Sequence, residues 1–282
     1  IFDWLQEAAY PDQPMGRTIL GPAERVARFA RDDLSGFVAE HYGPGQMIVS
    51  AAGAVDHDRV VAQAGEIFGH LSPVIGTARE AARWQGSESR RVKRLEQAHF
   101  ALGFEGPGYR ADDFYPAQIW TAALGGGMSS RLFQKIREER GLCYTIFAQS
   151  GFHDDTGMLT IYAGTGAEDL GDLATLTIDE VRRAADDMSE AEIARAKAQL
   201  RAGLLMGLES PSGQAERMAR SLAIWGRVPD PAEVAERIAA VTAADVRAHA
   251  EALLANARPA LALYGPVDGA PSREALAERL AA

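Results

Sequence analysis

Apolar residues recur at helical spacing in several separate segments of the chain. A repeat of roughly 3.6 residues is typical of a helix that packs one face on a core. The helices predicted from this spacing cover residues 2–9, 32–42, 57–69, 111–124 and 129–139. Four or five more helices are expected in the last part of the chain, where Ser189 with Glu192 and Thr242 with Asp245 match the capping-box pattern of a helix start.

Short apolar runs bounded by turn-forming residues predict strands. These runs cover residues 47–52, 97–104, 143–151, 157–164 and 259–264. The turn-prone segment His153–Gly157 joins two of them, which indicates an antiparallel pair. The order of elements predicts an α+β fold, in which helices pack on one face of a mostly antiparallel sheet.

Residues 72–90 show little periodicity and are rich in residues that favour loops. This segment divides the chain into a first domain at 1–75, a linker at 76–92 and a second domain at 93–282. The first domain combines a predicted strand with helices, as the second does. We therefore expect two related domains.

Charge and cysteine content exclude several classes of protein. The 282-residue chain has a formal net charge of −10, which disfavours a nucleic-acid partner because phosphate binding needs a basic surface. No apolar run reaches the length of a transmembrane helix, so we expect no membrane partner. Cys143 is the single cysteine, which excludes an intrachain disulfide and a cysteine-based zinc site.

Three consecutive glycines, Gly125–Gly127, invite comparison with a phosphate-binding loop. Such a loop follows a strand and carries Lys and Ser or Thr after its last glycine, whereas here a predicted helix precedes the glycines and Met128 follows them. A nucleotide-dependent enzyme therefore ranks behind the two functional hypotheses given at the end of this section. We expect instead that the glycines let the chain approach a facing domain or a substrate closely before it turns into helix 129–139.

The histidines of the chain do not show the spacing of a helical zinc site. None of the six is paired at the i, i+4 spacing that places two imidazoles on one helical face. The segment Phe37–His41 has the frame of an H-x-x-E-H motif, but Phe37 cannot ligate a metal. We expect Phe37 to face a core and Glu40 to face solvent.

Arg137 and Tyr144 are the polar side chains best placed for binding chemistry. Gly141 is a natural stop for helix 129–139, and Tyr144 opens the next strand. A helix end, a tight turn and a strand start can bring a guanidinium and a phenol to one rim, where they could hold a peptide carbonyl or a developing oxyanion. The alternative stays open that Arg137 pairs with neighbours such as Glu138 and that Tyr144 is a half-buried strand residue.

The segment Leu124–Phe133, followed by Arg137-Glu138 and by Arg140–Tyr144, resembles the second-domain signature of the M16 (pitrilysin/insulinase) zinc metallopeptidases. The resemblance is closest to the bacterial branch that is similar to mitochondrial processing peptidase, and it covers nearly the whole chain. It implies two similar α/β-roll domains that face each other across a chamber, of which the first is incomplete here.

The resemblance also implies roles for individual residues. In the family, an Arg and a Tyr of the second domain contact the substrate and its transition state, and these match Arg137 and Tyr144. Gly126, Gly127 and Ser129 fall in the matching glycine-serine segment and are expected to be substrate-binding.

The zinc site of the family lies on the first domain, where an inverted H-x-x-E-H motif and a downstream Glu hold the metal. This sequence contains no H-x-x-E-H. We therefore expect zinc only in the complete family enzyme, with no metal ligand and no catalytic residue in this chain, and no hydrolysis by this chain alone. Because the chain begins at Ile1 and not at Met, we take it as processed or truncated, with the zinc-binding segment missing or on a separate chain.

Two functional hypotheses follow from the resemblance. The first is a segment of a zinc-dependent endopeptidase that binds extended peptides between two domains. The second is a non-catalytic M16 homologue that binds substrate or a partner chain. The expected partners are a peptide or protein substrate and either the zinc-binding segment or a second M16 chain, in a homodimer or a heterodimer. We expect a cytoplasmic bacterial protein, with the periplasm left open.

Overall fold

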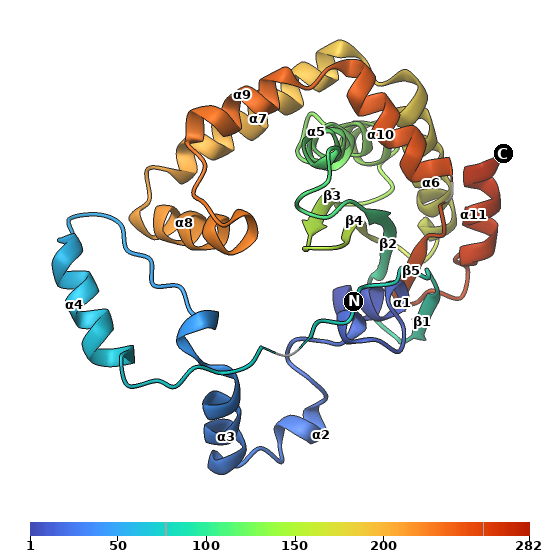
Figure 1. Cartoon of the computed structure of the whole chain (residues 1–282). Coiled ribbons are helices and arrows are strands. Elements are labelled where there is room, and N and C mark those ends of the chain that lie inside the picture. The colour runs from blue at the N-terminus through green and yellow to red at the C-terminus, as the bar shows by residue number, and fades with distance from the viewer. Residues whose placement is uncertain (77, 256) are drawn as a thin grey trace. The chain divides into compact units, whose positions relative to one another are not determined.

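The computed structural model describes residues 1–76, 78–255 and 257–282 (Figure 1). The chain forms two compact units, each built from separate stretches of sequence. Unit 1 contains residues 1–18, 81–201 and 235–282, and unit 2 contains residues 19–80 and 202–234. The domains expected from the sequence are continuous ranges of the chain, whereas these units are defined by compactness. The expected domain boundaries therefore stay a prediction.

Unit 1 is built on a five-stranded sheet with the order β1-β5-β2-β4-β3. The strands are β1 (Glu88–Val92), β2 (Ala98–Gly106), β3 (Thr145–Phe152), β4 (Gly157–Thr165) and β5 (Ala260–Gly265). β1 runs parallel to β5, and the other neighbouring strands are antiparallel. This confirms the mostly antiparallel sheet and the predicted hairpin of β3 and β4.

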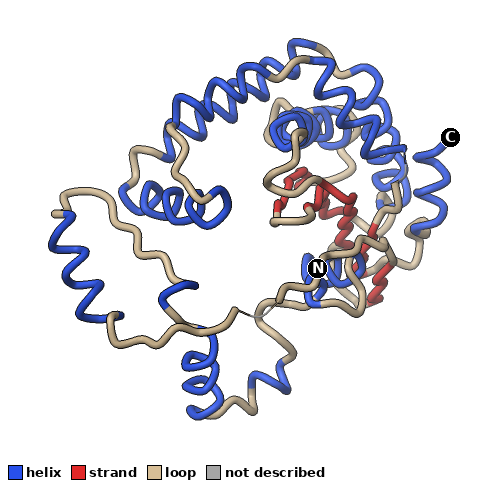
Figure 2. Tube along the Cα trace, viewed as in Figure 1, coloured by secondary structure: helices blue, strands red, loops and turns tan. Residues whose placement is uncertain are grey.

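The two faces of this sheet carry different cores. Ala101, Ala260 and Ala262 pack with α1 (Phe2–Ala9) on one face. Phe100 and Leu102 are fully buried and alternate with Ala101 along β2, so they point to the opposite face. That face is covered by helices, as Figure 2 shows: α5 (Phe114–Gly125), α6 (Leu170–Asp187) and α10 (Ala243–Ala255), with α11 (Arg273–Ala281) packed beside α6. The predicted α+β fold is confirmed, with α1 added on the second face.

Unit 2 is helical in the part of it that the structure describes. Its helices are α2 (Ala23–Val26), α3 (Arg31–His41), α4 (His57–Phe68) and α8 (Pro211–Trp225), and α7 (Glu190–Gly207) and α9 (Pro231–Ala240) contribute one end each. The helices predicted over 32–42 and 57–69 are therefore confirmed. Single 3₁₀ turns occur at η2 (Pro44–Gln46) in this unit and at η1 (Pro14–Gly16) in unit 1.

The strand predicted over residues 47–52 is wrong. Met47 has extended backbone angles, but within the described residues the segment 47–52 pairs with no strand. A strand forms only where a neighbour satisfies its amide and carbonyl groups. The apolar run reports a preference for extended backbone, and it cannot supply that neighbour.

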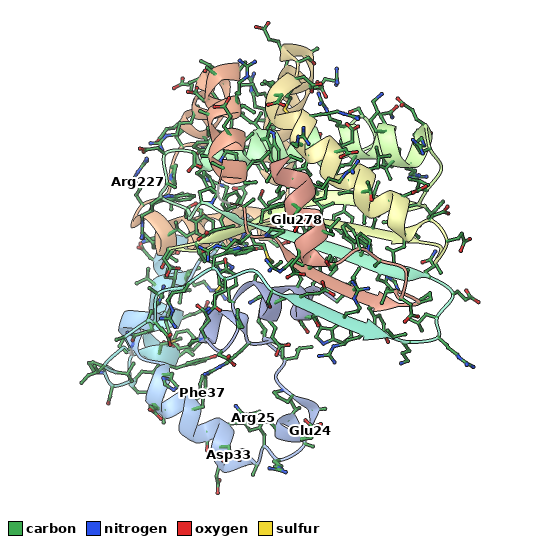
Figure 3. The ribbon with its side chains drawn as sticks, turned by 90° about the vertical axis from the view of Figure 1, so that its right-hand side faces the viewer. Glu24, Arg25, Asp33, Phe37, Arg227 and Glu278 are labelled. Carbon is green, nitrogen blue, oxygen red and sulfur yellow. The ribbon has the colours of Figure 1, made fainter. Side chains whose placement is uncertain are left out.

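The expectation that Phe37 faces a core is also wrong. Phe37 is 55% exposed on α3 (Figure 3), and its ring centroid lies 4.4 Å from that of His41. Helical periodicity gives the side of a helix that is apolar, whereas burial requires another element to cover that side. Among the described residues, none of α3 is buried.

The sequence pattern does not predict β1, because most of its residues are polar or charged. The strand is held by pairing with β5 and by Arg90, which donates to the carbonyls of Val267 (2.9 Å) and Ala270 (3.1 Å). The hydrogen-bond partners of Arg90 are backbone oxygens far away in the sequence, so no local pattern indicates them.

Candidate functional site

The segment after the three glycines forms the π-helix η3 (Phe133–Glu138). The Glu139 amide donates to the carbonyl of Gln134 at 2.9 Å, which is the i to i+5 bond of a π-helix. Leu132 and Ile136 are fully buried and fix this helix on the core of unit 1. The predicted helix 129–139 is therefore present, but it has the i to i+5 hydrogen bonds of a π-helix, which apolar periodicity does not indicate.

Gly141 turns the chain from η3 toward β3. Its φ of 65° lies in the left-handed region that favours glycine, and the next amide, of Leu142, donates to the carbonyl of Ile136 at 3.1 Å. Arg137 on the last turn of η3 and Tyr144 just before β3 meet as a result. The guanidinium carbon of Arg137 lies 4.9 Å from the centroid of the Tyr144 ring.

The donors of Arg137 are not committed to a hydrogen bond within the described residues. The side chain is 30% exposed, and its Nε forms an ion pair with Glu138 Oε1 at 3.6 Å, as the alternative interpretation expects, but this distance is longer than a hydrogen bond. Tyr144 is 77% exposed and so is not the half-buried residue of the alternative interpretation. A cation and a phenol that both face solvent can bind a carbonyl or carboxylate oxygen.

The glycines before η3 differ in what requires them. A Cβ at Gly125 would lie 2.4 Å from the backbone nitrogen of Ala148 in β3, so glycine allows α5 to pack on the sheet. This close approach is within unit 1. The sequence pattern predicted an approach to a facing domain or a substrate instead. Gly126, Gly127 and Ser129 are exposed, and the Gly126 carbonyl accepts a hydrogen bond from Gln199 (2.8 Å).

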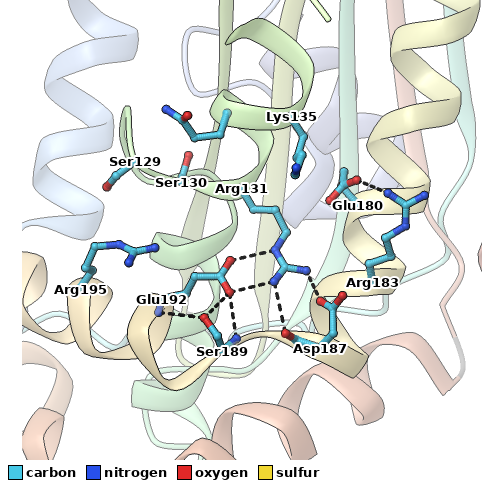
Figure 4. Close-up of a pocket in the computed structure, with 11 residues that line it drawn as sticks. Ser129, Ser130, Arg131, Lys135, Glu180, Arg183, Asp187, Ser189, Glu192 and Arg195 are labelled. Atoms are coloured by element: carbon cyan, nitrogen blue, oxygen red, sulfur yellow. Dashed lines mark hydrogen bonds and ion pairs between the residues drawn. The ribbon is translucent and has the colours of Figure 1, made fainter. Parts of the chain in front are cut away.

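Ser129 borders an open pocket of about 490 Å³ (Figure 4). Most of the charges around this pocket pair with one another. Arg131 donates to Glu192 through Nε (3.0 Å) and Nη2 (2.9 Å) and also contacts Asp187. Arg137 and Tyr144 do not border the pocket. We interpret the charged residues around this pocket as an ion-pair network that joins the residue before η3 to the start of α7.

The network changes the acid-base behaviour of Glu192. Burial alone would raise the pKa of this carboxyl, but hydrogen bonds from Arg131 and Ser189 outweigh burial and lower the pKa to about 2. Glu192 also accepts from the Ser189 amide (2.8 Å), which confirms the predicted capping box. The glutamate is therefore a charged structural residue at neutral pH.

The described residues do not form a zinc site. In the part of the chain that the structure describes, no group of three or more His, Cys, Asp or Glu side chains could hold a metal ion. Cys143 is buried, and burial raises the pKa of its thiol to about 11 although Arg137 lowers it. Because these residues do not fit zinc, we derive no hydrolytic step for them. No helix among the described residues is long and apolar enough to cross a membrane.

Comparison with known proteins assigns the family. Residues 28–200, more than half of the chain, match the family profile described as "Peptidase M16 inactive domain". The chain belongs to the M16 peptidase family. This confirms the resemblance that the glycine-serine-arginine segment carries.

Individual relatives show the same relationship. A protein of Rickettsia felis described as an uncharacterized zinc protease is 34% identical over 95% of this chain and 65% of its own length. The probable mitochondrial-processing peptidase subunit beta of Arabidopsis thaliana is 34% identical over 96% of this chain and 54% of its own. The chain thus spans about two thirds or less of the length of these relatives.

A solved structure shows the same fold. A chain in "Complex III2 from Candida albicans, Inz-5 bound" superposes with a TM-score of 0.88 and 22% sequence identity, over 99% of this chain and 69% of that chain. At this identity the likeness shows the fold alone.

Two contacts of the candidate site residues are not predicted from the sequence. The guanidinium carbon of Arg137 also lies 4.4 Å from the centroid of the Phe133 ring. The i, i+4 spacing of Phe133 and Arg137 on one helix is a local signal that could have indicated this contact. The bond from Gln199 to Gly126 joins residues far apart in sequence, and no local pattern indicates it.

Proposed function

We propose that this chain is the peptide-binding part of a zinc-dependent endopeptidase of the M16 family. The observation that carries the proposal is the contact of Arg137 with Tyr144, both with donors that face solvent, on a helix anchored by buried residues. An extended peptide presents a carbonyl oxygen at every residue, and these two side chains supply matching donors. The description of relatives as zinc proteases supports the enzyme class.

In this proposal the chain binds and orients the substrate, and it does not activate water. Arg137 and Tyr144 would hold a carbonyl of the bound peptide, and the exposed Gly127 and Ser129 would border it. Metal ligands and the general base would come from outside the described residues. The zinc named for the relatives therefore belongs to the complete enzyme.

A non-catalytic subunit is the second candidate function. The family profile that matches residues 28–200 is described as an inactive domain, and one relative is described as a subunit of a processing peptidase. In this case the same side chains would bind a peptide for a partner chain that carries the metal. The two candidates differ in whether the metal-binding segment belongs to the same polypeptide.

Unit 2 supports the proposal that a further segment binds this chain. Segment 48–51, α4 and α8 line an apolar pocket of about 370 Å³. Val49, Val61 and Leu222 in its walls are 53%, 55% and 43% exposed. We propose that the zinc-binding segment of the enzyme covers these side chains and pairs with residues 47–52, because this segment has no strand partner among the described residues and an unpaired backbone can accept an added strand.

The test measures binding and cleavage separately. A fluorescein-labelled unstructured peptide rich in Lys and Arg is titrated with this chain, and binding is followed by fluorescence anisotropy. We expect Arg137→Ala to weaken binding about tenfold, and Tyr144→Phe by a smaller factor, because one charge-assisted hydrogen bond contributes about 1.5 kcal/mol. Wild-type affinity in both variants would mean that the pair is structural.

The cleavage arm uses the same peptide with added zinc. We expect no cleavage by this chain alone, because its described residues offer no metal site. Cleavage that a chelator abolishes would contradict that expectation. In the complete enzyme, both substitutions should lower turnover without lowering the melting temperature.

A further inference from the structure

Two arginines close together in the sequence are used in opposite ways. The guanidinium of Arg131 is engaged by Glu192 and Asp187, so most of its donors are committed inside the protein. Arg137 makes an ion pair with the exposed Glu138 at 3.6 Å but no hydrogen bond through its side chain within the described residues. Its guanidinium carbon lies instead over the rings of Phe133 (4.4 Å) and Tyr144 (4.9 Å).

Ring contacts leave the guanidinium donors available. A guanidinium that lies over an aromatic face is attracted by the electron density of that ring, while its N–H groups point outward in the guanidinium plane. Such an edge matches the geometry of a flat carboxylate or peptide group. The two aromatic contacts therefore orient Arg137 without using the donors that a ligand needs.

The two rings differ in how firmly they are held. Phe133 is half-buried and stands next to Leu132, which is fully buried in the core. Tyr144 is 77% exposed, so little besides Arg137 restricts its ring. Phe133 also occupies the position four residues before Arg137, where side chains on one side of a helix meet. The fixed support of the guanidinium is therefore Phe133.

We propose that Phe133 is a positioning residue, whose ring holds the guanidinium of Arg137 so that its N–H edge faces the planar oxygen group of a bound peptide. This inference rests on the proposed function, since it assumes that Arg137 binds the peptide. It assigns the site a preference for flat, two-oxygen or carbonyl groups over spherical anions. Lysine cannot replace Arg137 in this role, because an ammonium has no planar edge.

The orientation is tested first without any peptide. In the NMR spectrum of this chain, the Arg137 side-chain Nε–Hε signal is assigned as the one lost in Arg137→Lys. We expect Phe133→Leu to shift this signal, because the ring current of Phe133 is removed. Phe133→Tyr should leave it near its wild-type position. An Arg137 signal that Phe133→Leu does not move would overturn the inference, whatever the peptide does.

The second test is a double-mutant cycle with the labelled Lys- and Arg-rich peptide. We expect Phe133→Leu to weaken binding about 2- to 5-fold, as for loss of one exposed cation–π contact. Phe133→Tyr should restore wild-type binding, and Arg137→Lys should bind as weakly as Arg137→Ala. In the Arg137→Ala background, Phe133→Leu should have no further effect, since its ring then has no guanidinium to hold.

Phe152→Leu is the matched control. Phe152 lies at the far end of β3 and packs on Phe114, with ring centroids 4.6 Å apart. The same loss of a ring at this position should leave peptide binding unchanged. Melting temperatures of all variants show whether a weaker complex reflects unfolding.

The outcomes separate the two claims. Equal weakening by Phe133→Leu with and without Arg137 would overturn the positioning role and leave the proposed function intact. So would wild-type binding by Phe133→Leu when Arg137→Ala binds weakly. Wild-type binding by both Arg137→Ala and Tyr144→Phe would reject the proposed function, and the positioning role would fall with it.

Discussion

Glu192 is the residue on which the contacts around η3 converge. Its carboxylate accepts hydrogen bonds from Arg131, which lies just before η3, and from the amide and hydroxyl of Ser189 at the start of α7. One charge therefore both caps α7 and holds the arginine. Since η3 also carries Arg137, the position of the candidate site depends on this carboxylate.

We expect unit 1 to lose stability as the pH falls from about 4.5 to about 2. The pKa of Glu192 is lowered from 4.5 to about 2 in the folded chain. A group whose folded pKa is depressed stabilises the fold above its unfolded pKa, and this contribution is lost as the pH falls through the folded pKa. The melting temperature should therefore decrease over this range in the wild type.

Glu192→Gln isolates the contribution of this carboxylate. At pH 7 the variant should be less stable by about 1–3 kcal/mol, because Arg131 then keeps only the exposed Asp187 as a charged partner. Its melting temperature should depend less on pH between 2 and 4.5 than that of the wild type. If the melting temperatures of the two proteins changed equally with pH across this range, Glu192 would not be the group responsible.

At the residue scale, the sequence predicted chemistry that is local and missed chemistry that is not. Arg137 and Tyr144 were predicted to meet because a helix stop at Gly141 separates them, and the structure places them in contact. Arg131 was not singled out, because its partners come from another helix. The role of Arg137 and Tyr144 in binding stays a prediction until peptide binding is measured.

At the scale of elements, the contact of α5 with β3 sets where the glycine-rich loop begins. Gly125 is the last residue of α5, and it lies so close to Ala148 that a Cβ would meet the backbone nitrogen at 2.4 Å. Helix and strand therefore approach each other more closely than any side chain at this position would permit. The loop Gly126–Ser129 starts from this contact.

Gly125→Ala should destabilise the chain by about 1–3 kcal/mol, the usual cost of forcing an extra methyl group into a packed contact. Gly203→Ala is the control, because Gly203 lies inside α7 and a Cβ there meets nothing within 4 Å. This second change should be neutral or stabilise by up to about 1 kcal/mol, since alanine favours helix. Urea denaturation measures both, and equal effects of the two substitutions would refute the packing argument.

Element predictions succeeded where an element satisfies its own backbone or pairs with a sequence neighbour. Helices over 32–42 and 57–69 and the hairpin of β3 and β4 are of this kind. The predictions for β1 and for segment 47–52 were wrong in opposite ways, since β1 is a strand that the pattern missed and 47–52 is a predicted strand that does not form. β1 is polar but finds a distant partner in β5, while the apolar segment 47–52 finds none among the described residues.

At the scale of the whole molecule, the class of the fold could be predicted but the division into compact units could not. The order of strands and helices was enough to indicate an α+β fold. The units each combine stretches from different parts of the chain, such as 1–18 with 81–201. A pattern read along the sequence detects loops between elements, and it does not detect which distant elements pack together.

The two units also differ in how deeply their elements are buried, and this predicts unequal local stability. In the described residues, α2, α3 and α4 bury no side chain, whereas α5 buries residues on most of its sides and α6 buries half of its residues. Helices that bury little apolar surface open at low free energy. Hydrogen exchange followed by mass spectrometry should therefore be fast in peptides from 31–68 and slow in peptides from β2, β4 and α5.

The same experiment tests whether unit 2 awaits a partner. α8 belongs to unit 2 and buries Ser221 and Ile224, so its peptides should exchange at an intermediate rate. In an enzyme that also carries the proposed zinc-binding segment, exchange should slow over 31–68 and stay unchanged in β2, because only the exposed apolar side chains of unit 2 gain cover. Equal protection of α4 and α5 in this chain alone would show that the exposed apolar residues of unit 2 do not lower its stability. Slow exchange over 48–68 only in the longer protein would support a partner on the apolar pocket lined by segment 48–51, α4 and α8.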